Sequence, residues 1–362
     1  MELMIEDVMD SLIEQGGSDM HIQAGAPIYF RISGKLTPQP EFGEELDAQF
    51  CQRLIFSMLN NNQRKALEQN WELDCAYGVK GLARFRVNVY RERGCFAACL
   101  RALPFKIPNF EKLGVPEIMR ELSERPRGMV LITGQTGSGK TTTIAAILDL
   151  INRTRSEHII TVEDPIEYVF PNIKSLFHQR QRGEDTKSFA NALRAALRED
   201  PDIILVGEMR DLETTGLAVS AAETGHLVFG TMHTNSAAGT IDRLLDVFPP
   251  IQQLQIRAQI SGSLVGVCSQ NLVNKIGGGR CAAQEIMVNT PAIGNLIREG
   301  KTAQIYSAIQ TGAKMGMQTM EMALARLVQE NKVTYEDAIG KCNKIDELNR
   351  LIGPGVKAGA KK

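Results

Sequence analysis

The chain has 362 residues with 41 basic and 42 acidic side chains, which gives a formal net charge of −1 at pH 7. This length suggests two domains with ample core, and the balanced charge gives no overall attraction to nucleic acid or to an anionic membrane. No apolar stretch reaches the roughly 18 residues of a membrane-spanning helix, so no transmembrane segment is expected.

The cysteines and the first residues indicate a cellular compartment. The 7 cysteines include no C-x-x-C pair, which argues against a structural zinc site, and their odd number argues against a disulfide framework. Met1–Asp7 is acidic and lacks the basic start of a secretory signal peptide. We therefore expect a reduced, cytoplasmic protein.

Residues 1–103 indicate a small α+β domain without a phosphate-binding motif. Helical periodicity covers residues 3–14, β-type alternation covers 21–32 and 82–103, and one or two helices are expected over 51–70. Two prolines within residues 104–111 indicate an interdomain linker.

Residues 112–352 alternate between apolar strands and helices, which predicts an α/β fold with a mostly parallel sheet covered on both faces. Only helices are expected after Pro291, and residues 353–362 read as a flexible tail. The predicted strands are 129–133, 158–162, 202–206 and 227–232, and the predicted helices between them are 141–152, 187–199 and 212–223.

A complete G-x-x-x-x-G-K-[ST] phosphate loop lies between the first of these strands and its helix. Glycines let backbone N–H groups curl around phosphate oxygens, and the helix N-terminus adds partial positive charge. Lys140 is expected to reach the β- and γ-phosphates of ATP, and the Thr141 hydroxyl to bind Mg²⁺. The predicted nucleotide-binding residues are Gly134, Gln135, Thr136, Gly137, Ser138, Gly139, Lys140, Thr141 and Thr142.

Two later strands end in carboxylates. Glu163 closes the strand after the loop helix, and Glu208 follows the strand 202–206, which fits a Walker B strand without its usual terminal Asp. Because ligands of open α/β sheets bind beyond the carboxyl ends of the strands, both side chains should face the nucleotide. We expect Glu163 to be the general base and Glu208 to hold a Mg²⁺-bound water, although these two roles can be exchanged.

His226 and His233 bracket the strand 227–232. The two ends of a strand are too far apart for joint metal ligation. A histidine near a core strand is more often structural than catalytic, but two bracketing one strand favour a role. We expect His233 to sense the γ-phosphate and His226 to be an orienting group.

From the loop to the last histidine, the order of these motifs resembles the secretion-superfamily ATPases. Within that group, the chain closely resembles the type IV pilus retraction ATPases, the PilT family, over nearly its whole length. The segments that carry this closer resemblance are Gly207–Thr214, Gly230–Ala237, Gly316–Met320 and Gly17–His21.

The resemblance implies a RecA-like ATPase domain preceded by a PAS-like domain, assembled as a homohexamer with nucleotide at the subunit interface. It also implies arginines that reach in from the N-terminal domain, and Arg86 and Arg101 fit the family's spacing. Guanidinium groups suit the spreading charge of phosphoryl transfer. Neighbouring arginines that could be confused with them are Arg84, Arg91 and Arg93.

The implied partners are an inner-membrane pilus platform protein and a paralogous retraction ATPase, with no nucleic acid. The implied location is cytoplasmic, at the inner-membrane base of the pilus machine. One departure from the family is Gly294, which replaces the first arginine of an A-I-R-N-L-I-R-E signature. The alternatives are a pilus-assembly or secretion motor, a low-activity regulatory paralogue, and a nucleic-acid translocase, the last disfavoured by the neutral charge.

Overall fold

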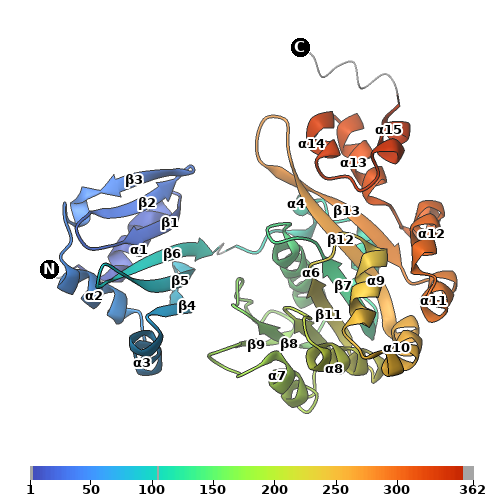
Figure 1. Ribbon diagram of the computed structural model, residues 1–362, viewed down its shortest axis with the longest axis horizontal. Helices are drawn as coiled ribbons and strands as arrows, with labels where there is room; N and C mark the ends of the chain where they lie inside the picture. The colour runs from blue at the N-terminus through green and yellow to red at the C-terminus, as the bar shows by residue number, and fades with distance from the viewer. Residues whose placement is uncertain (1–2, 104–105, 354–362) are drawn as a thin grey trace. The chain divides into compact units, whose positions relative to one another are not determined.

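The computed structural model describes residues 3–103 and 106–353, and the chain divides into two compact units (Figure 1). The first unit comprises the described residues up to Lys106 together with Pro165–Val169, and the second comprises Ile107–Asp164 and Phe170 onward. Apart from Gly353, the predicted tail lies outside the described residues, as do residues 104 and 105 of the predicted linker.

The first unit is built on a six-stranded antiparallel sheet of order β3-β2-β1-β6-β5-β4. Helices α1 and α2 share one apolar core with one face of this sheet, including Phe85 and Val87, so the predicted small α+β domain is confirmed. The strands are β1 (Gly17–Ile22), β2 (Ile28–Ile32), β3 (Lys35–Gln39), β4 (Glu72–Val79), β5 (Ala83–Glu92) and β6 (Cys95–Leu103). The helices are α1 (Ile5–Glu14), α2 (Ala48–Ser57) and α3 (Asn61–Asn70), and a short 3-10 turn is η1 (Pro40–Phe42).

The second unit contains a seven-stranded sheet of order β13-β12-β7-β11-β10-β8-β9. Its strands run parallel except β13, which pairs antiparallel to β12. The predicted α/β class with a mostly parallel sheet is therefore confirmed. The strands are β7 (Gly128–Thr133), β8 (His158–Glu163), β9 (Leu176–Gln181), β10 (Ile203–Val206), β11 (Leu227–Met232), β12 (Leu264–Asn274) and β13 (Arg280–Val288).

Helices cover both faces of this sheet. Helices α8, α9 and α10 pack on the face that carries Met129 and Leu131. Right-handed crossovers toward opposite sheet edges put their helices on opposite faces, so α6, between β7 and β8, lies on the other face. The helices before β12 are α4 (Phe110–Leu113), α5 (Glu117–Ser123), α6 (Lys140–Thr154), α7 (Phe189–Ala196), α8 (Leu212–Glu223), α9 (Ala237–Asp246) and α10 (Pro250–Ser263).

The prediction of helices alone after Pro291 is confirmed for the described part of the chain. Among the described residues, no helix is both long and apolar enough to cross a bilayer. These last helices are α11 (Pro291–Arg298), α12 (Ile305–Thr311), α13 (Met320–Gln329), α14 (Tyr335–Ile339) and α15 (Ile345–Ile352), with 3-10 turns η2 (Thr302–Gln304) and η3 (Ala313–Met315).

Candidate ATPase site

The neighbouring strands β7, β11, β10 and β8 end side by side along one side of the parallel sheet. We call this side, where the carboxyl ends of the strands lie, the loop edge. Backbone bonds join them beyond the regular pairing: the Gly134 N–H donates to the Met232 carbonyl at 3.2 Å, and the Gly207 N–H donates to the Val162 carbonyl at 2.8 Å. The phosphate loop leaves β7 at this edge, between β11 and β12. The phosphate loop and both acidic strand ends therefore lie beyond the carboxyl ends of parallel strands, where ligands of open α/β sheets bind.

Two loop glycines are required by close packing as well as by backbone conformation. Gly134 and Gly139 have φ values of +143° and +85°, which L side chains rarely adopt. A Cβ at Gly134 would lie 2.3 Å from the Gln270 carbonyl oxygen, and one at Gly139 would lie 2.8 Å from the Gln270 side-chain nitrogen. The loop is therefore pressed against β12, which leaves no room for side chains at these two positions.

Lys140 is the first residue of α6, and its ammonium lies over the loop. It donates to the Gly134 carbonyl at 2.7 Å and to the Gln135 carbonyl at 3.1 Å. Thr141 and Thr142 follow in the first turn, where backbone N–H groups have no partner within the helix and can receive an anion. The Lys140 charge and these donors thus lie at the same end of α6.

Glu208 and His233 are brought together although they follow different strands. His233 Nε2 lies 2.8 Å from Glu208 Oε1, and Arg210 Nε donates to the same oxygen. The Glu208 side chain keeps 21% of its surface exposed. The structure therefore forms a carboxylate–imidazole pair at the loop edge of the sheet, a contact that was not predicted from the sequence.

Glu163 lies at the same edge but in a different environment. It is buried at the end of β8, where it accepts hydrogen bonds from Thr161 Oγ1 at 2.6 Å and from Gln179 Nε2 at 3.3 Å. Strands β10 and β8 are two and three positions from β7, at about 4.8 Å per position. Glu208 is therefore carried nearer to the loop strand than Glu163 is.

His226 is not brought to this edge. It precedes β11, its carbonyl accepts from the Gly128 N–H at the beginning of β7, and its Nδ1 lies 3.0 Å from the Ala221 carbonyl. At about 3.3 Å per residue, the strand separates it from His233 by roughly 20 Å. Within this chain, His226 lies at the opposite end of the sheet from the phosphate loop.

The two predicted arginines of the first unit are direct cross-strand neighbours. Arg86 on β5 pairs with Arg101 on β6, and Arg101 pairs in turn with Asp19 on β1. Both arginines are exposed on the face opposite Phe85 and Val87. Like charges placed directly opposite each other are unfavourable, so this face needs a counter-charge or an anion.

Asp19 supplies part of that counter-charge. Its Oδ1 accepts from Arg101 Nε at 2.8 Å. Burial alone would favour the neutral acid, but hydrogen bonds from Ser18 and Arg101 hold the pKa of Asp19 below its ordinary value. The same hydrogen bond raises the pKa of Arg101. Sequence reasoning gave Asp19 no role, although the residue lies in the Gly17–His21 motif.

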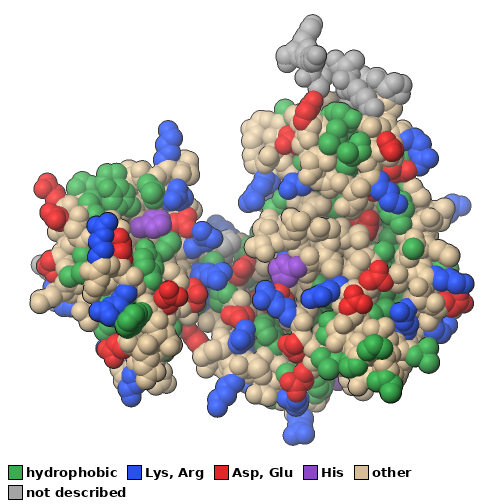
Figure 2. Space-filling view, in the orientation of Figure 1, with side chains coloured by type: hydrophobic (Ala, Val, Ile, Leu, Met, Phe, Trp, Pro, Cys, Tyr) green, Lys and Arg blue, Asp and Glu red, His purple; other side chains and the backbone are tan. Residues whose placement is uncertain are grey.

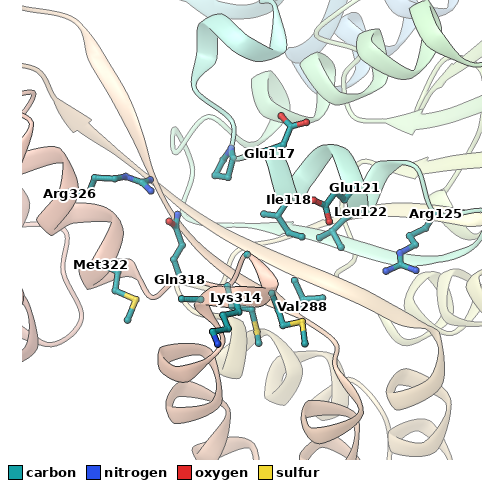
Figure 3. Close-up of a pocket in the computed structure, with 15 residues that line it drawn as sticks. Glu117, Ile118, Glu121, Leu122, Arg125, Val288, Lys314, Gln318, Met322 and Arg326 are labelled. Atoms are coloured by element: carbon teal, nitrogen blue, oxygen red, sulfur yellow. The ribbon is translucent and has the colours of Figure 1, made fainter.

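A separate pocket of about 680 Å³ lies in the second unit. Figure 3 shows side chains of α5, such as Glu117 and Ile118, on one side, and Lys314 and Met322 on the other. Its lining mixes acidic, basic and apolar groups. No motif in the sequence indicated this pocket. On the face shown in Figure 2, acidic and basic side chains are interspersed over the molecule without a continuous band of one sign.

Comparison with known proteins gives close relatives over nearly the full length. Residues 1–347 match the family model described as type II/IV secretion system protein. The chain is 51% identical over 337 residues to the type IV pilus retractation ATPase PilT of Pseudomonas aeruginosa, covering 92% of this chain and 96% of that protein. It is 50% identical over 295 residues to a twitching motility protein of Neisseria gonorrhoeae, covering 81% and 79%.

A solved structure gives the same result in three dimensions. The crystal structure described as the pilus retraction motor PilT with bound ADP matches with a TM-score of 0.91 at 51% identity. The match covers 96% of this chain and 100% of that one. Both compact units thus have counterparts in a nucleotide-binding motor.

Proposed function

This chain belongs to the type II/IV secretion system protein family and is an ATPase, and from this premise we propose that it is the motor that retracts a type IV pilus and so drives twitching motility. The observation that carries the proposal is the full-length likeness to a retraction ATPase at 51% identity. The intact phosphate loop and the contact between Glu208 and His233 support an active enzyme over a low-activity regulatory paralogue.

The geometry of the loop edge supports the following proposed residue roles. Lys140 and the N-terminus of α6 bind the phosphates of ATP. Glu163 is the general base that takes a proton from the attacking water, and Glu208 with His233 faces the γ-phosphate. The exchanged assignment, with Glu208 as the base, is supported by two observations. Glu208 is more exposed than Glu163, and its strand β10 lies one position nearer to β7, the strand that precedes the phosphate loop. His226 lies at the other sheet edge and is left out of this machinery.

The residues present suit a magnesium ion. Mg²⁺ prefers hard oxygen donors and keeps several waters, and the Thr141 hydroxyl and the Glu208 carboxylate are such donors at one edge of the sheet. Thr141 would bind the ion directly and Glu208 through a water. When bound, the ion would offset the phosphate charge that develops during transfer.

The motor is proposed to act as a homohexamer in which Arg86 and Arg101 complete the site of a neighbouring subunit. Their exposure on an open sheet face, side by side and incompletely neutralised by Asp19, supports this role. Guanidinium groups from a neighbour can stabilise the transition-state charge of phosphoryl transfer. ATP turnover then depends on how the two units of adjacent subunits meet.

The remaining parts of the proposal concern the cell. The hexamer is cytoplasmic, lies at the inner-membrane base of the pilus machine and transmits its motion to a platform protein there. A paralogous retraction ATPase is a further proposed partner, and nucleic acid is not expected as one. A pilus-assembly or secretion motor is the alternative function.

The test is complementation in a piliated bacterium that lacks its own retraction ATPase. The wild-type chain and a Lys301→Ala control, which alters an exposed lysine paired with Glu299, should restore twitching and shorten pilus lifetimes. Lys140→Ala should restore neither. If the wild-type protein is active as an ATPase but instead increases piliation, the chain is an assembly motor.

A further inference from the structure

Gln270 is a buried polar side chain beside the phosphate loop that the proposed chemistry does not use. It lies on β12 and is 2% exposed. The preceding residue, Ser269, pairs with Thr133 at the point where β7 ends and the loop begins. Burial of an amide is unfavourable unless its groups are hydrogen-bonded, so its partners show what the side chain holds.

The Gln270 amide makes three hydrogen bonds. Nε2 donates to the Ser138 carbonyl at 2.6 Å, and Oε1 accepts from Thr143 Oγ1 at 2.8 Å and from Gln284 Nε2 at 2.8 Å. Because the Ser138 carbonyl can only accept, the amide nitrogen must face it, which fixes the orientation of the whole group. One side chain thus ties the loop and the first turn of α6 to β12.

The hydrogen bond to Ser138 controls the direction of a donor in the loop. A trans peptide is planar, and its C=O and N–H point in opposite directions. With the Ser138 carbonyl turned to β12, the Gly139 N–H of the same peptide is turned away from β12. We propose that Gln270 is a positioning residue that aims this N–H at the bound phosphate.

The Gln270 side chain is held in turn by a second glutamine on β13. Gln284 lies directly opposite Gln270 on β13, and the backbone carbonyl of Gln284 accepts from Gln318 Nε2 at 2.7 Å. Gln318 lines the pocket in Figure 3. The Gln284 side chain thus holds the Gln270 amide, and Gln318 bonds the β13 backbone at the same residue. The position of the Ser138 peptide therefore depends on the edge strand β13.

This inference rests on the proposed role of the phosphate loop. A purely structural glutamine would support folding without affecting nucleotide affinity, whereas a positioning residue would affect affinity for the phosphates. The aimed N–H contacts phosphate in both the ground state and the transition state. Its loss should therefore raise KM more than it lowers kcat.

The test compares Gln270→Met, which keeps the length of the side chain and removes the amide, with Ser269→Ala. Ser269 Oγ lies 2.8 Å from Thr133 Oγ1, so the control removes a buried hydrogen bond one residue away without touching Ser138. For Gln270→Met, the Kd for ADP by calorimetry and the KM for ATP should each rise about tenfold, or about 1.4 kcal/mol. The kcat should change less, and Ser269→Ala should leave both constants unchanged.

Gln284→Met is the second variant: it removes the hydrogen bond that Gln284 Nε2 donates to Gln270 Oε1, and so weakens the hold on the Gln270 amide while both groups of its bond to Ser138 remain present. Its KM for ATP should rise about threefold, and this result decides the matter if Gln270→Met does not fold. Unchanged constants in the folded glutamine variants, or an equal rise in Ser269→Ala, would overturn the inference. Lys140→Ala separates the two proposals: normal ADP affinity in that variant contradicts the loop assignment itself.

Discussion

The charged side chains at the loop edge have hydrogen-bond or ion-pair partners within the protein. Lys140 donates to two loop carbonyls, and Glu208 accepts from Arg210 and lies against His233. Unpaired charge at a partly buried edge is costly, so these contacts satisfy the charged groups within the protein. Under the proposed function, nucleotide binding would exchange these partners for phosphate and metal, and substitutions here should affect binding and turnover more than folding.

Removal of the Lys140 charge tests the loop assignment. Lys140→Ala loses a charge-assisted phosphate contact worth about 1.5–3 kcal/mol, while its present bonds are to carbonyls at a partly exposed position. We expect hydrolysis below detection and an unfolding temperature close to that of wild type. A phosphate-release assay and thermal denaturation measure both, and wild-type turnover in the variant would refute the assignment.

The two acidic strand ends can be separated by amide substitution. Glu163→Gln and Glu208→Gln keep the shape of the side chains and remove their charge, so we expect both variants to bind ATP and to hydrolyse it poorly. ATP binding is measured by calorimetry and turnover by phosphate release. Near-normal turnover in Glu163→Gln together with an inactive Glu208→Gln would reverse the two roles.

Glu285 on β13 should make stability depend on pH. Burial, and to a lesser degree the nearby Glu321 charge, raises the pKa of Glu285, whose Oε1 accepts from the Ala237 N–H at 2.7 Å. The folded state therefore holds this proton at pH values where the unfolded chain has released it. The contribution of this proton to the free energy of unfolding is present below the ordinary pKa of 4.5 and is lost as pH rises through the folded pKa.

Glu285→Gln keeps the carbonyl that accepts from Ala237 and cannot ionise. The difference in free energy of unfolding between the variant and wild type should therefore grow in favour of the variant as pH rises above about 4.5. Urea unfolding of both proteins across this range measures the difference. A difference that does not change with pH would show that Glu285 does not hold its proton on folding.

At the scale of elements, α11 forms although it contains Gly294 in place of the family arginine. Thr290 Oγ1 caps its first turn by accepting from the Ile293 N–H at 3.4 Å. The helix packs against α10, and a Cβ at Gly294 would lie 3.3 Å from the Ser261 carbonyl oxygen. Because β13 is antiparallel to β12, α11 follows it at the amino end of the parallel strands, away from the loop.

This placement predicts that position 294 affects coupling rather than chemistry. Gly294→Arg should leave the ATPase turnover of the purified protein unchanged, and any effect should appear in pilus retraction by complemented cells. Phosphate release and twitching-zone diameter are the two measurements. A large loss of turnover in a folded Gly294→Arg protein would show that α11 communicates with the nucleotide site.

The sequence predicted those elements whose patterns are local. The strands before the loop and around the histidines are continuous apolar runs, and their carboxyl ends correctly located Glu163, Glu208 and His233. Strand β12 was missed because Ser269 and Gln270 interrupt its apolar run, and the partners Thr133 and Ser138 that they bond lie more than a hundred residues away in the chain. Strand β9 was missed because Leu176–Gln181 is mostly polar.

The same contrast between local patterns and long-range contacts explains which properties of the site residues could be predicted. A chain-order pattern places a histidine at each end of β11 but does not state which end carries chemistry, and the structure puts His226 at the other edge. The family resemblance pointed to Arg86 and Arg101 but did not give the register that pairs them, or the hydrogen bond from Arg101 to Asp19. Long-range pairing in a sheet fixes these relations, and one sequence contains no local signal for them.

At the scale of the whole molecule, the proposed machinery is divided between two compact units. The second unit carries the phosphate loop and the acidic strand ends, and the first carries the arginine pair. A ring of identical chains can unite the two halves at every interface, so that hydrolysis in one subunit depends on a unit of the next. Such an arrangement links ATP turnover to movement between subunits, which is what a retraction motor requires.

Mixing of two inactive variants tests this shared site most directly. In a ring of Arg101→Ala and Lys140→Ala subunits, some interfaces pair an intact loop with an intact arginine, whereas neither variant alone forms such an interface. Because a trans arginine can supply a factor of about 10³ or more, we predict that turnover recovers at intermediate mixing ratios once subunit exchange is confirmed. Absence of recovery at every ratio despite exchange, or high turnover of Arg101→Ala alone, would contradict the account.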